Sequence, residues 1–351
     1  MAPRRTEKVG GAPCHRRVAS WRSSSIGRLH EHPTSISAPL LDDVLPPAEV
    51  RPGRAARRRT IQALAAGERA LALGGGGSTS NAWLIGVIAG LFESGLDVTR
   101  ADLTIGTSAG STAAAQLAGT SPTELLAAIL SAAPHQTGRL PTRPVADHLD
   151  RLRRIVASAE GAADLRRRMG AAALDQDAAS DGSWQTRWRA TVAARLPTHS
   201  WAQRRLLITA VEAHTGEPVV FDQHSGVDLT DAVAASCSSR LTYRVRDNRY
   251  IAGGHRRSSE NADLAADCGR VLVLSPLGGR TLTPVDWGAH LAAQVGELRA
   301  RGSRAETIFP ASSSELLFGA SAMDVSLRPP AARAGYDQGT AMAEQVSQLW
   351  R

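Results

Sequence analysis

The sequence is poor in the residues that mark disulfide-rich and metal-binding proteins. It contains three cysteines, Cys14, Cys237 and Cys268, which lie far apart and form no CxxC pair. This spacing argues against a disulfide framework and against a zinc site, so no metal ligand set is expected. The plain interpretation is reduced thiols in a cytosolic protein.

Long apolar runs and aromatic residues are also scarce. No stretch approaches the ~18 apolar residues that a membrane-spanning helix needs, and the Arg-rich N-terminus lacks the apolar stretch of a secretory signal. Aromatic residues make up 4% of the chain, whereas hydrophobic residues make up 42%. We therefore expect a soluble, cytoplasmic protein with a core built mainly from Ala, Leu, Val and Ile.

The formal net charge of +8 is unevenly distributed. Residues 1–60 contain twelve Lys or Arg and five Asp or Glu, and the rest of the chain is close to neutral. The basic character belongs to a tail, so no nucleic-acid partner is expected for the folded domain. Pro, Ser and Arg dominate residues 1–66, which predicts a disordered leader.

Short apolar strands alternate with small-residue helices from residue 70 onward. Residues 70–73 end in four glycines, residues 103–105 end in a G-T-S-A-G turn before an Ala-rich helix, and residues 270–274 read as a further buried strand. The alternation predicts an α/β fold, a three-layer sandwich around a mainly parallel sheet. Residues 122–200 are predicted to form a helical cap insertion, and residues 276–351 a helical extension packed on the domain.

The turn Gly106-Thr107-Ser108-Ala109-Gly110 matches G-x-S-x-G. A nucleophile at a sharp strand-to-helix turn takes a strained backbone, and the glycines on either side leave room for it. The helix that follows presents free N–H groups at its positive end. The strand before and the helix after therefore favour a nucleophile elbow at Ser108, and a turn of small packing residues is the alternative.

The four glycines at residues 74–77 form a second loop without side chains. Such a loop can serve as an oxyanion hole, because its amides are open to the charge that develops on a carbonyl oxygen. A phosphate-binding loop would need Gly-Lys-Ser/Thr at its end, but here Ser78, Thr79 and Ser80 follow. A dinucleotide fingerprint would need glycine at Ser80. A tight turn without further function is the remaining alternative.

Together these motifs resemble the patatin-like phospholipase family over roughly residues 70–275. The matching segments are residues 71–77, 82–83 with Gly86, 106–110, 231–237, 250–254 and 261–265. The resemblance implies a serine esterase that hydrolyses acyl esters of lipids with a Ser–Asp dyad and without a cofactor. It assigns Ser108 as the nucleophile and the amides of Gly75, Gly76 and Gly77 as the oxyanion hole, with an acyl lipid or small ester as substrate.

The sequence departs from the family pattern at the dyad aspartate. The aspartate is expected directly before Gly253-Gly254, but Ala252 stands there. Because a serine hydroxyl is a weak nucleophile without a base, losing one member of the pair typically reduces the rate by about 10⁴ to 10⁶. In addition, Ser80 replaces a glycine that is frequent in the family, and the stretch 238–242 is short and lacks proline.

His255, three residues after Ala252, is the nearest candidate for a substitute base. The alternative is that His255 is an exposed polar residue, and the neighbouring charges of Arg256 and Arg257 are expected to lower its pKa. Other titratable residues that the fold could bring to Ser108 are Asp247, Glu260, Asp263, His214 and His224.

Three functions compete. The first is a lipid acyl hydrolase, impaired by Ala252. The second is an inactive relative, a pseudoenzyme, that binds acyl lipid or a protein partner through the same cleft. The third is nucleotide binding, which leaves Ser108 unexplained. Peripheral membrane contact suits a lipid-handling protein, although no amphipathic anchor stands out, and the oligomeric state is open.

Overall fold

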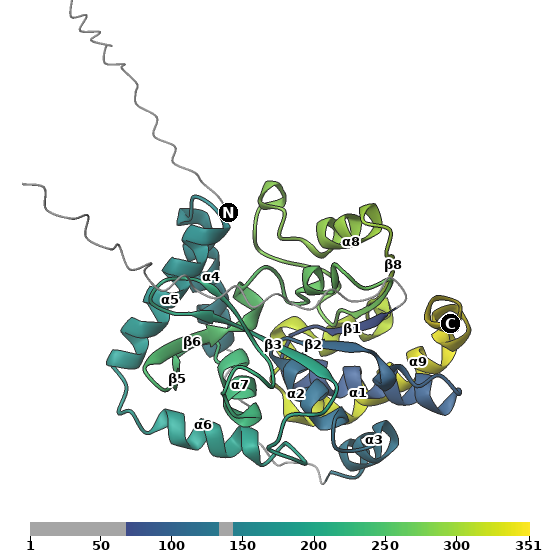
Figure 1. Ribbon diagram of the computed structural model, residues 1–351. Coiled ribbons are helices and arrows are strands. Elements are labelled where there is room, and N and C mark those ends of the chain that lie inside the picture. Colours follow the sequence, from purple (N-terminus) through teal and green to yellow (C-terminus); the bar gives the residue numbers. More distant parts are fainter. Residues whose placement is uncertain (1–67, 133–142) are drawn as a thin grey trace, which may run out of the picture. The chain divides into compact units, whose positions relative to one another are not determined.

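The computed structural model describes residues 68–132 and 143–351, which belong to one compact unit, Thr60–Arg351 (Figure 1). The predicted leader, residues 1–66, lies outside the described residues, as do residues 133–142 of the predicted cap. Within the described ranges, no helix combines the length and the apolar character needed to cross a bilayer.

The described residues form an eight-stranded sheet in the order β5-β6-β3-β2-β1-β7-β8, with β4 paired to β3. The strands are β1 (Arg69–Leu73), β2 (Leu103–Gly106), β3 (Arg205–Glu212), β4 (Pro218–Phe221), β5 (Tyr243–Val245), β6 (Asn248–Ala252), β7 (Arg270–Leu274) and β8 (Arg304–Ile308). The five strands β3, β2, β1, β7 and β8 are parallel, whereas β4, β5 and β6 pair antiparallel. The predicted mainly parallel sheet is confirmed.

The helices follow the strands along the chain. They are α1 (Ser78–Glu93), α2 (Ala109–Leu117), α3 (Pro122–Ser131), α4 (Arg143–Ser158), α5 (Ala162–Ala178), α6 (Trp184–Ala193), α7 (Leu229–Ser236), α8 (Leu291–Ala300) and α9 (Arg328–Trp350). Short 3₁₀ turns, among them Gly253–His255 and Ala262–Ala265, connect several of these elements.

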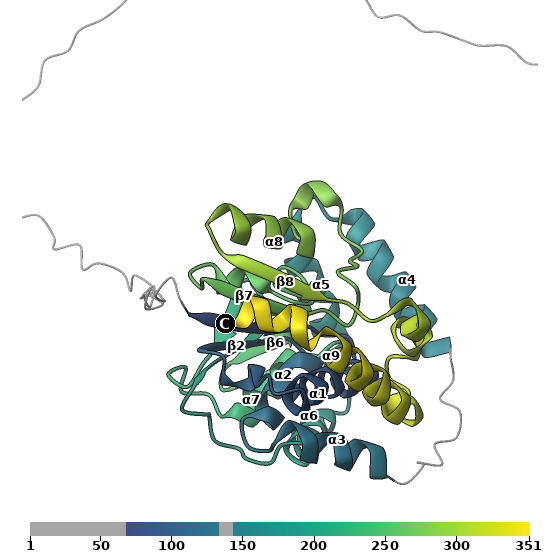
Figure 2. The same cartoon turned by 90° about the vertical axis from the view of Figure 1, so that its right-hand side faces the viewer.

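Side chains of the central strands alternate between two hydrophobic cores, as the period of a strand requires. In β1, Leu71 and Leu73 pack with α1, α2, α7 and α9, whereas Ala70 and Ala72 pack with α8 and the turn Ala262–Ala265. Both views show α8 on one side of the sheet and α1 and α2 on the other (Figures 1 and 2). The predicted three-layer α/β sandwich is therefore confirmed.

The segment predicted as a helical cap contains α3, α4, α5 and α6. Helix α5 packs through Leu165 and Met169 against Val211 of β3 and Ile251 of β6. This contact seats α5 against the antiparallel end of the sheet. Closure of these helices over a site stays a prediction.

The C-terminal segment contributes a strand as well as helices. Strand β8 extends the sheet beside β7, so the sheet continues beyond the predicted boundary at residue 275. Helix α9 lies against α1 at very close range: a methyl group at Gly86 would overlap the Ala332 carbonyl, and one at Gly335 would overlap the Trp83 carbonyl. The close backbone approach requires glycine at both positions and makes α9 an integral part of one helical layer.

Candidate active site

Two turns meet where the parallel strands β1 and β2 end. Leu73 lies opposite Gly106 in the register of the two strands, and the Thr107 N–H donates to the Leu73 carbonyl at 3.1 Å. The glycine loop follows β1 and the G-x-S-x-G turn follows β2. The parallel pairing therefore brings the two predicted motifs to the same edge of the sheet.

Ser108 occupies a strained turn between β2 and α2. Its backbone angles are φ 52° and ψ −115°, and it is the residue immediately before the helix. Few non-glycine residues adopt positive φ, and such strain clusters at functional sites. The residue is half-buried and stands at the start of a helix.

The glycines on either side of Ser108 are required by close backbone packing. A methyl group at Gly106 would lie 2.6 Å from Ser111 Cα, and one at Gly110 would overlap the Leu73 carbonyl. The pattern G-x-S-x-G thus follows from how tightly α2 folds back on the ends of β1 and β2.

The glycine loop reaches Ser108 directly. A methyl group at Gly75 would lie 3.2 Å from Ser108 Cβ. The Gly75 N–H donates to the Ser259 carbonyl at 2.8 Å, which fixes the loop but occupies that amide. Gly76 and Gly77 have φ of 140° and 94°. Within the described part of the chain, their N–H groups donate no hydrogen bond.

Two hydrogen bonds fix the backbone of the turn at Ser108. Its N–H donates to Ser236 Oγ at 2.9 Å, and Ser111 Oγ donates to its carbonyl at 2.6 Å. Ser236 is the last residue of α7, a helix predicted from the segment 231–237 without any such role. The sequence offered no signal for this contact, because the two residues lie 128 positions apart.

Cys237 lies beside the same turn. Its Sγ is 3.6 Å from Ser111 Oγ and 3.6 Å from Thr112 Oγ1. Burial raises the pKa of the Cys237 thiol, and hydrogen bonds with Ser111 and Thr112 oppose this only in part. A thiol with a raised pKa stays protonated near neutral pH and is a poor nucleophile.

The Ala252-Gly253-Gly254 motif follows β6 and is linked to the elbow by one side chain. Asn261 Nδ2 donates to the Gly253 carbonyl at 3.0 Å and to Thr107 Oγ1 at 3.0 Å. Gly253 and Thr107 therefore belong to one hydrogen-bonded unit, with Ala252 next to one end and Ser108 next to the other. Ala252 itself is buried.

Asn261 is the residue whose role the sequence analysis missed. It is fully buried, takes a left-handed conformation with φ 51°, and also contacts Thr209 Oγ1 at 3.3 Å. Asparagine tolerates this conformation better than most residues. The available signal was its place in the segment 261–265, one of those that carry the family resemblance, but that resemblance assigned it no task.

The other candidate bases occupy different surroundings. His255 ends the 3₁₀ turn after Ala252 and is half-buried. Glu260 is buried and accepts hydrogen bonds from three serine hydroxyls, those of Ser258, Ser259 and Ser275. Asp263 pairs with Arg256 at 2.9 Å. A base role for His255 stays a prediction.

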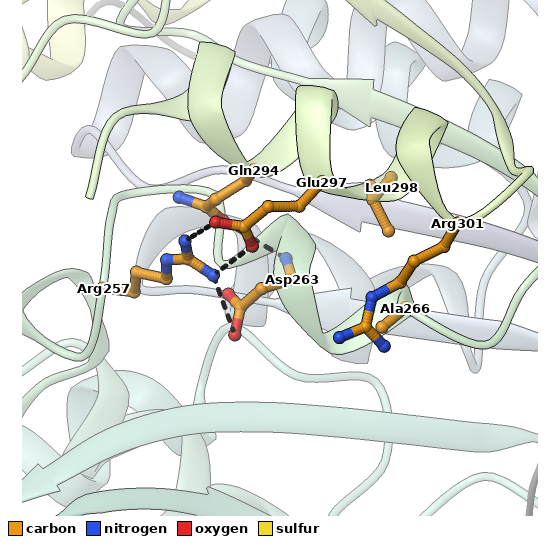
Figure 3. A pocket seen from close by; sticks show the side chains of 7 residues that line it. All are labelled: Arg257, Asp263, Ala266, Gln294, Glu297, Leu298 and Arg301. Carbon is orange, nitrogen blue, oxygen red and sulfur yellow. Dashed lines mark hydrogen bonds and ion pairs between the residues drawn. The ribbon is translucent and has the colours of Figure 1, made fainter. Parts of the chain in front are cut away.

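A small hollow of about 170 Å³ lies between α8 and the segment 257–266 (Figure 3). Arg257 pairs with Glu297 across it, and Asp263 lies 4.0 Å from the same guanidinium. Of the candidate bases, Asp263 lines this hollow, whereas Ser108 and the glycine loop do not. Within residues 68–132 and 143–351, no group of three His, Cys, Asp or Glu side chains forms a metal-binding cluster.

Comparisons with known proteins come from sequence and from structure. Residues 71–265 match the family described as patatin-like phospholipase. No curated protein matches the chain. The family match covers β1 through the turn that carries Asn261, so it includes both motifs at the sheet edge.

Solved structures of other proteins are similar to this chain, among them VipD and ExoU. VipD from Legionella pneumophila is 13% identical, with 79% of this chain and 67% of that chain covered and a TM-score of 0.37. The type III effector ExoU is 15% identical, with 80% and 53% covered and a TM-score of 0.35. ExoU in complex with SpcU from Pseudomonas aeruginosa is 18% identical, with 82% and 54% covered and a TM-score of 0.34. The chain spans about two thirds of VipD and about half of ExoU.

Proposed function

This chain belongs to the patatin-like phospholipase family, and from that premise we propose that it is a serine hydrolase of lipid acyl esters with Ser108 as nucleophile. The observation that carries the proposal is the approach of the glycine loop to Ser108, where a methyl group at Gly75 would lie 3.2 Å from Ser108 Cβ. A hydroxyl beside open amides is the arrangement that acyl transfer needs.

The proposed chemistry uses the serine and the main chain. Ser108 Oγ attacks the ester carbonyl, forming an acyl-enzyme and releasing the alcohol, and water then releases the fatty acid. Of the expected oxyanion donors, Gly76 and Gly77 remain available, whereas Gly75 holds the loop in place through Ser259. The N–H of Ala109, at the start of α2, is a third proposed donor, because the residue after the nucleophile supplies it in such elbows.

The absence of an aspartate at residue 252 limits the rate of the proposed hydrolysis. Ala252 brings a methyl group where the family places an aspartate, so proton removal from Ser108 falls to water or to His255. We therefore propose a slow enzyme. The same substitution favours the second candidate, a catalytically inactive protein that binds acyl lipid or a protein partner through this site.

Replacing Ser108 by alanine tests the proposal. Hydrolysis of p-nitrophenyl butyrate by the unmodified chain, measured as released nitrophenol, is expected to disappear in Ser108→Ala. A fluorophosphonate probe should likewise label the parent and not this variant, because only the serine Oγ can form the adduct.

The matched control is Ser131→Ala, a serine at the end of α3. It should keep the rate and labelling of the parent. Equal hydrolysis by the parent and Ser108→Ala would refute the proposed nucleophile. A parent that neither hydrolyses ester nor accepts the probe would instead favour the inactive binding protein.

We also propose a cytoplasmic protein that contacts lipid surfaces peripherally. Large apolar side chains are exposed on the segments that leave the carboxyl ends of β7 and β8, at the same edge as Ser108. They are Leu282, Val285, Phe309, Leu316 and Met323. Met323 Sδ also lies 3.0 Å from a methyl group added at Gly77. Figure 2 shows the chain leaving β8 and leading to α9.

The double variant Val285→Ser with Leu316→Ser tests this contact, because these side chains are 76% and 88% exposed. Sedimentation with phosphatidylcholine–phosphatidylglycerol vesicles should show binding weaker by about tenfold or more, since each side chain loses apolar burial in the lipid. Phe92→Ser, at the opposite end of α1, is the control and should bind as the parent does. Unchanged vesicle binding in the double variant would contradict the proposal.

A further inference from the structure

An arginine from the C-terminal helix is fixed beside the glycine loop. Arg328, the first residue of α9, donates through Nη1 to the Ser78 carbonyl at 2.9 Å and to Ser78 Oγ at 3.2 Å. Its Nη2 donates to Asn81 Oδ1 at 3.1 Å. Ser78 directly follows Gly77, so the guanidinium lies at the first turn of α1, which the glycine loop precedes. Arg328 lies outside the segment that matches the family.

A second arginine is joined to the first by two amide side chains. Asn81 Nδ2 donates to Gln116 Oε1 at 3.0 Å, and Gln116 Nε2 donates to the Arg195 carbonyl at 3.1 Å. The exposed Arg195 guanidinium lies 5.9 Å from the centre of the Trp188 ring. Its charge acts on Arg328 and also on the Cys237 thiol beside Ser108. Arg195 is therefore within electrostatic reach of both Arg328 and the thiol beside Ser108.

The positive charge at this place is not neutralised by the described residues. Neither guanidinium forms an ion pair with a carboxylate in that part of the chain. Burial lowers the pKa of Arg328, and the charge of Arg195 lowers it further. The start of α1 adds the positive end of a helix dipole. Arg328 is half-buried, and removing a cation even partly from water without a counter-charge is unfavourable, so this arrangement is suited to an anion.

A buried hydroxyl provides an independent sign of an absent partner. Ser80 Oγ is fully buried and has no hydrogen-bond partner in the described structure. It points at Gly76, because a methyl group added there would overlap it. Buried polar groups are nearly always hydrogen-bonded. The unpaired donor therefore lies at the glycine loop, beside the first turn that Arg328 contacts.

We propose that Arg328 and Arg195 form a subsite for the phosphate group of an anionic phospholipid whose acyl ester reaches Ser108. Guanidinium groups match phosphate oxygens with paired donors, and a helix N-terminus is a suitable anion site. The position of the ester rests on the proposed hydrolase function. Phosphate binding itself requires no turnover, so it can be measured separately.

Calorimetric titration of the full chain carrying Ser108→Ala tests the subsite without hydrolysis. The ligands are dihexanoyl phosphatidate, dihexanoylglycerol and inorganic phosphate, each below its aggregation concentration. Phosphatidate should bind about tenfold or more tightly than the diacylglycerol, which has the same chains without phosphate. Arg195→Gln should remove this preference, and Arg301→Gln, an exposed arginine at the end of α8, should retain it.

Arg328→Gln should also remove the preference, with its melting temperature measured because Arg328 holds the first turn of α1. If that variant does not fold, Arg195→Gln alone decides the matter. Equal affinity for phosphatidate and diacylglycerol, or a preference that survives Arg195→Gln, overturns the inference. Inorganic phosphate binding as tightly as phosphatidate would assign the site to free phosphate and overturn the lipid assignment.

The two proposals fail in different ways. If the protein shows no preference for phosphatidate but hydrolyses esters through Ser108, only the proposed phosphate subsite is refuted. If the protein prefers phosphatidate but hydrolyses no ester, only the proposed hydrolase function is refuted, and the protein is then one that binds anionic lipids.

Discussion

Replacing Ala252 by aspartate is expected to raise p-nitrophenyl butyrate hydrolysis by about 10²- to 10⁴-fold, the usual contribution of a positioned general base. The residue ends β6 directly before Gly253, whose carbonyl shares the Asn261 amide with Thr107. A carboxylate introduced there would stand at the same hydrogen-bonded unit as Ser108. Initial rates at neutral pH measure the gain.

The matched control is Ala252→Asn, which has the shape of aspartate but accepts no proton near neutral pH. It also reports any harm from filling a buried position, since Ala252 is 7% exposed. The gain should vanish when Ser108→Ala is combined with Ala252→Asp. Equal rates for the aspartate and asparagine variants would show that the site is not arranged for a base at residue 252.

The same assay decides the role of His255. If this histidine serves as the substitute base, His255→Ala lowers the residual rate of the parent and has little effect in the Ala252→Asp background. If both backgrounds respond alike, the histidine acts only through the local structure of its turn.

Substitution of Gly110 by alanine is expected to lower the free energy of unfolding by about 3 kcal/mol, at the upper end of the range for overpacking. The added methyl group would overlap the Leu73 carbonyl. The Leu73 carbonyl belongs to the backbone at the end of β1, and Gly110 belongs to the first turn of α2. Neither can therefore move aside as a flexible side chain would. Denaturant unfolding followed by circular dichroism gives the change as a shift in midpoint.

Gly296→Ala is the control for this substitution. Gly296 lies inside α8, is exposed, and no atom lies within 4 Å of an added methyl group. Alanine there should stabilise the protein by about 0.5 to 1 kcal/mol, because glycine is a poor helix former. A Gly110→Ala protein as stable as the parent would mean that α2 can move away from β1, and the tight elbow would then be in doubt.

The local elements were predictable because their signals are contiguous in the chain. Residues 70–73 and 270–274 are short apolar runs, which suit parallel strands buried on both faces, and the structure has β1 and β7 at these places. The G-x-S-x-G turn was likewise predictable, because the glycines that its tight backbone needs lie within the motif itself. Strand, turn and helix could therefore be assigned in order, and with them the three-layer α/β class.

The C-terminal region was harder to predict. Residues 304–308 form β8 with the sequence RAETI, which has no apolar run to mark it. Its place in the sheet comes from pairing with β7. The pattern of alternating and charged side chains there suits an edge strand, but it also suits a helix or a loop.

The sequence by itself determined that two loops, one of glycine and one around Ser108, end neighbouring strands of an α/β sheet. Only the tertiary structure decided what surrounds them: Ser259 occupies the Gly75 amide, Asn261 joins the turn of residue 253 to the elbow, and Arg328 reaches Ser78. The reason is physical. Turn geometry and hydrophobic period act between neighbours along the chain, whereas the pairs Gly75–Ser259, Thr107–Asn261 and Ser78–Arg328 are each more than 150 positions apart and meet only once the sheet has paired.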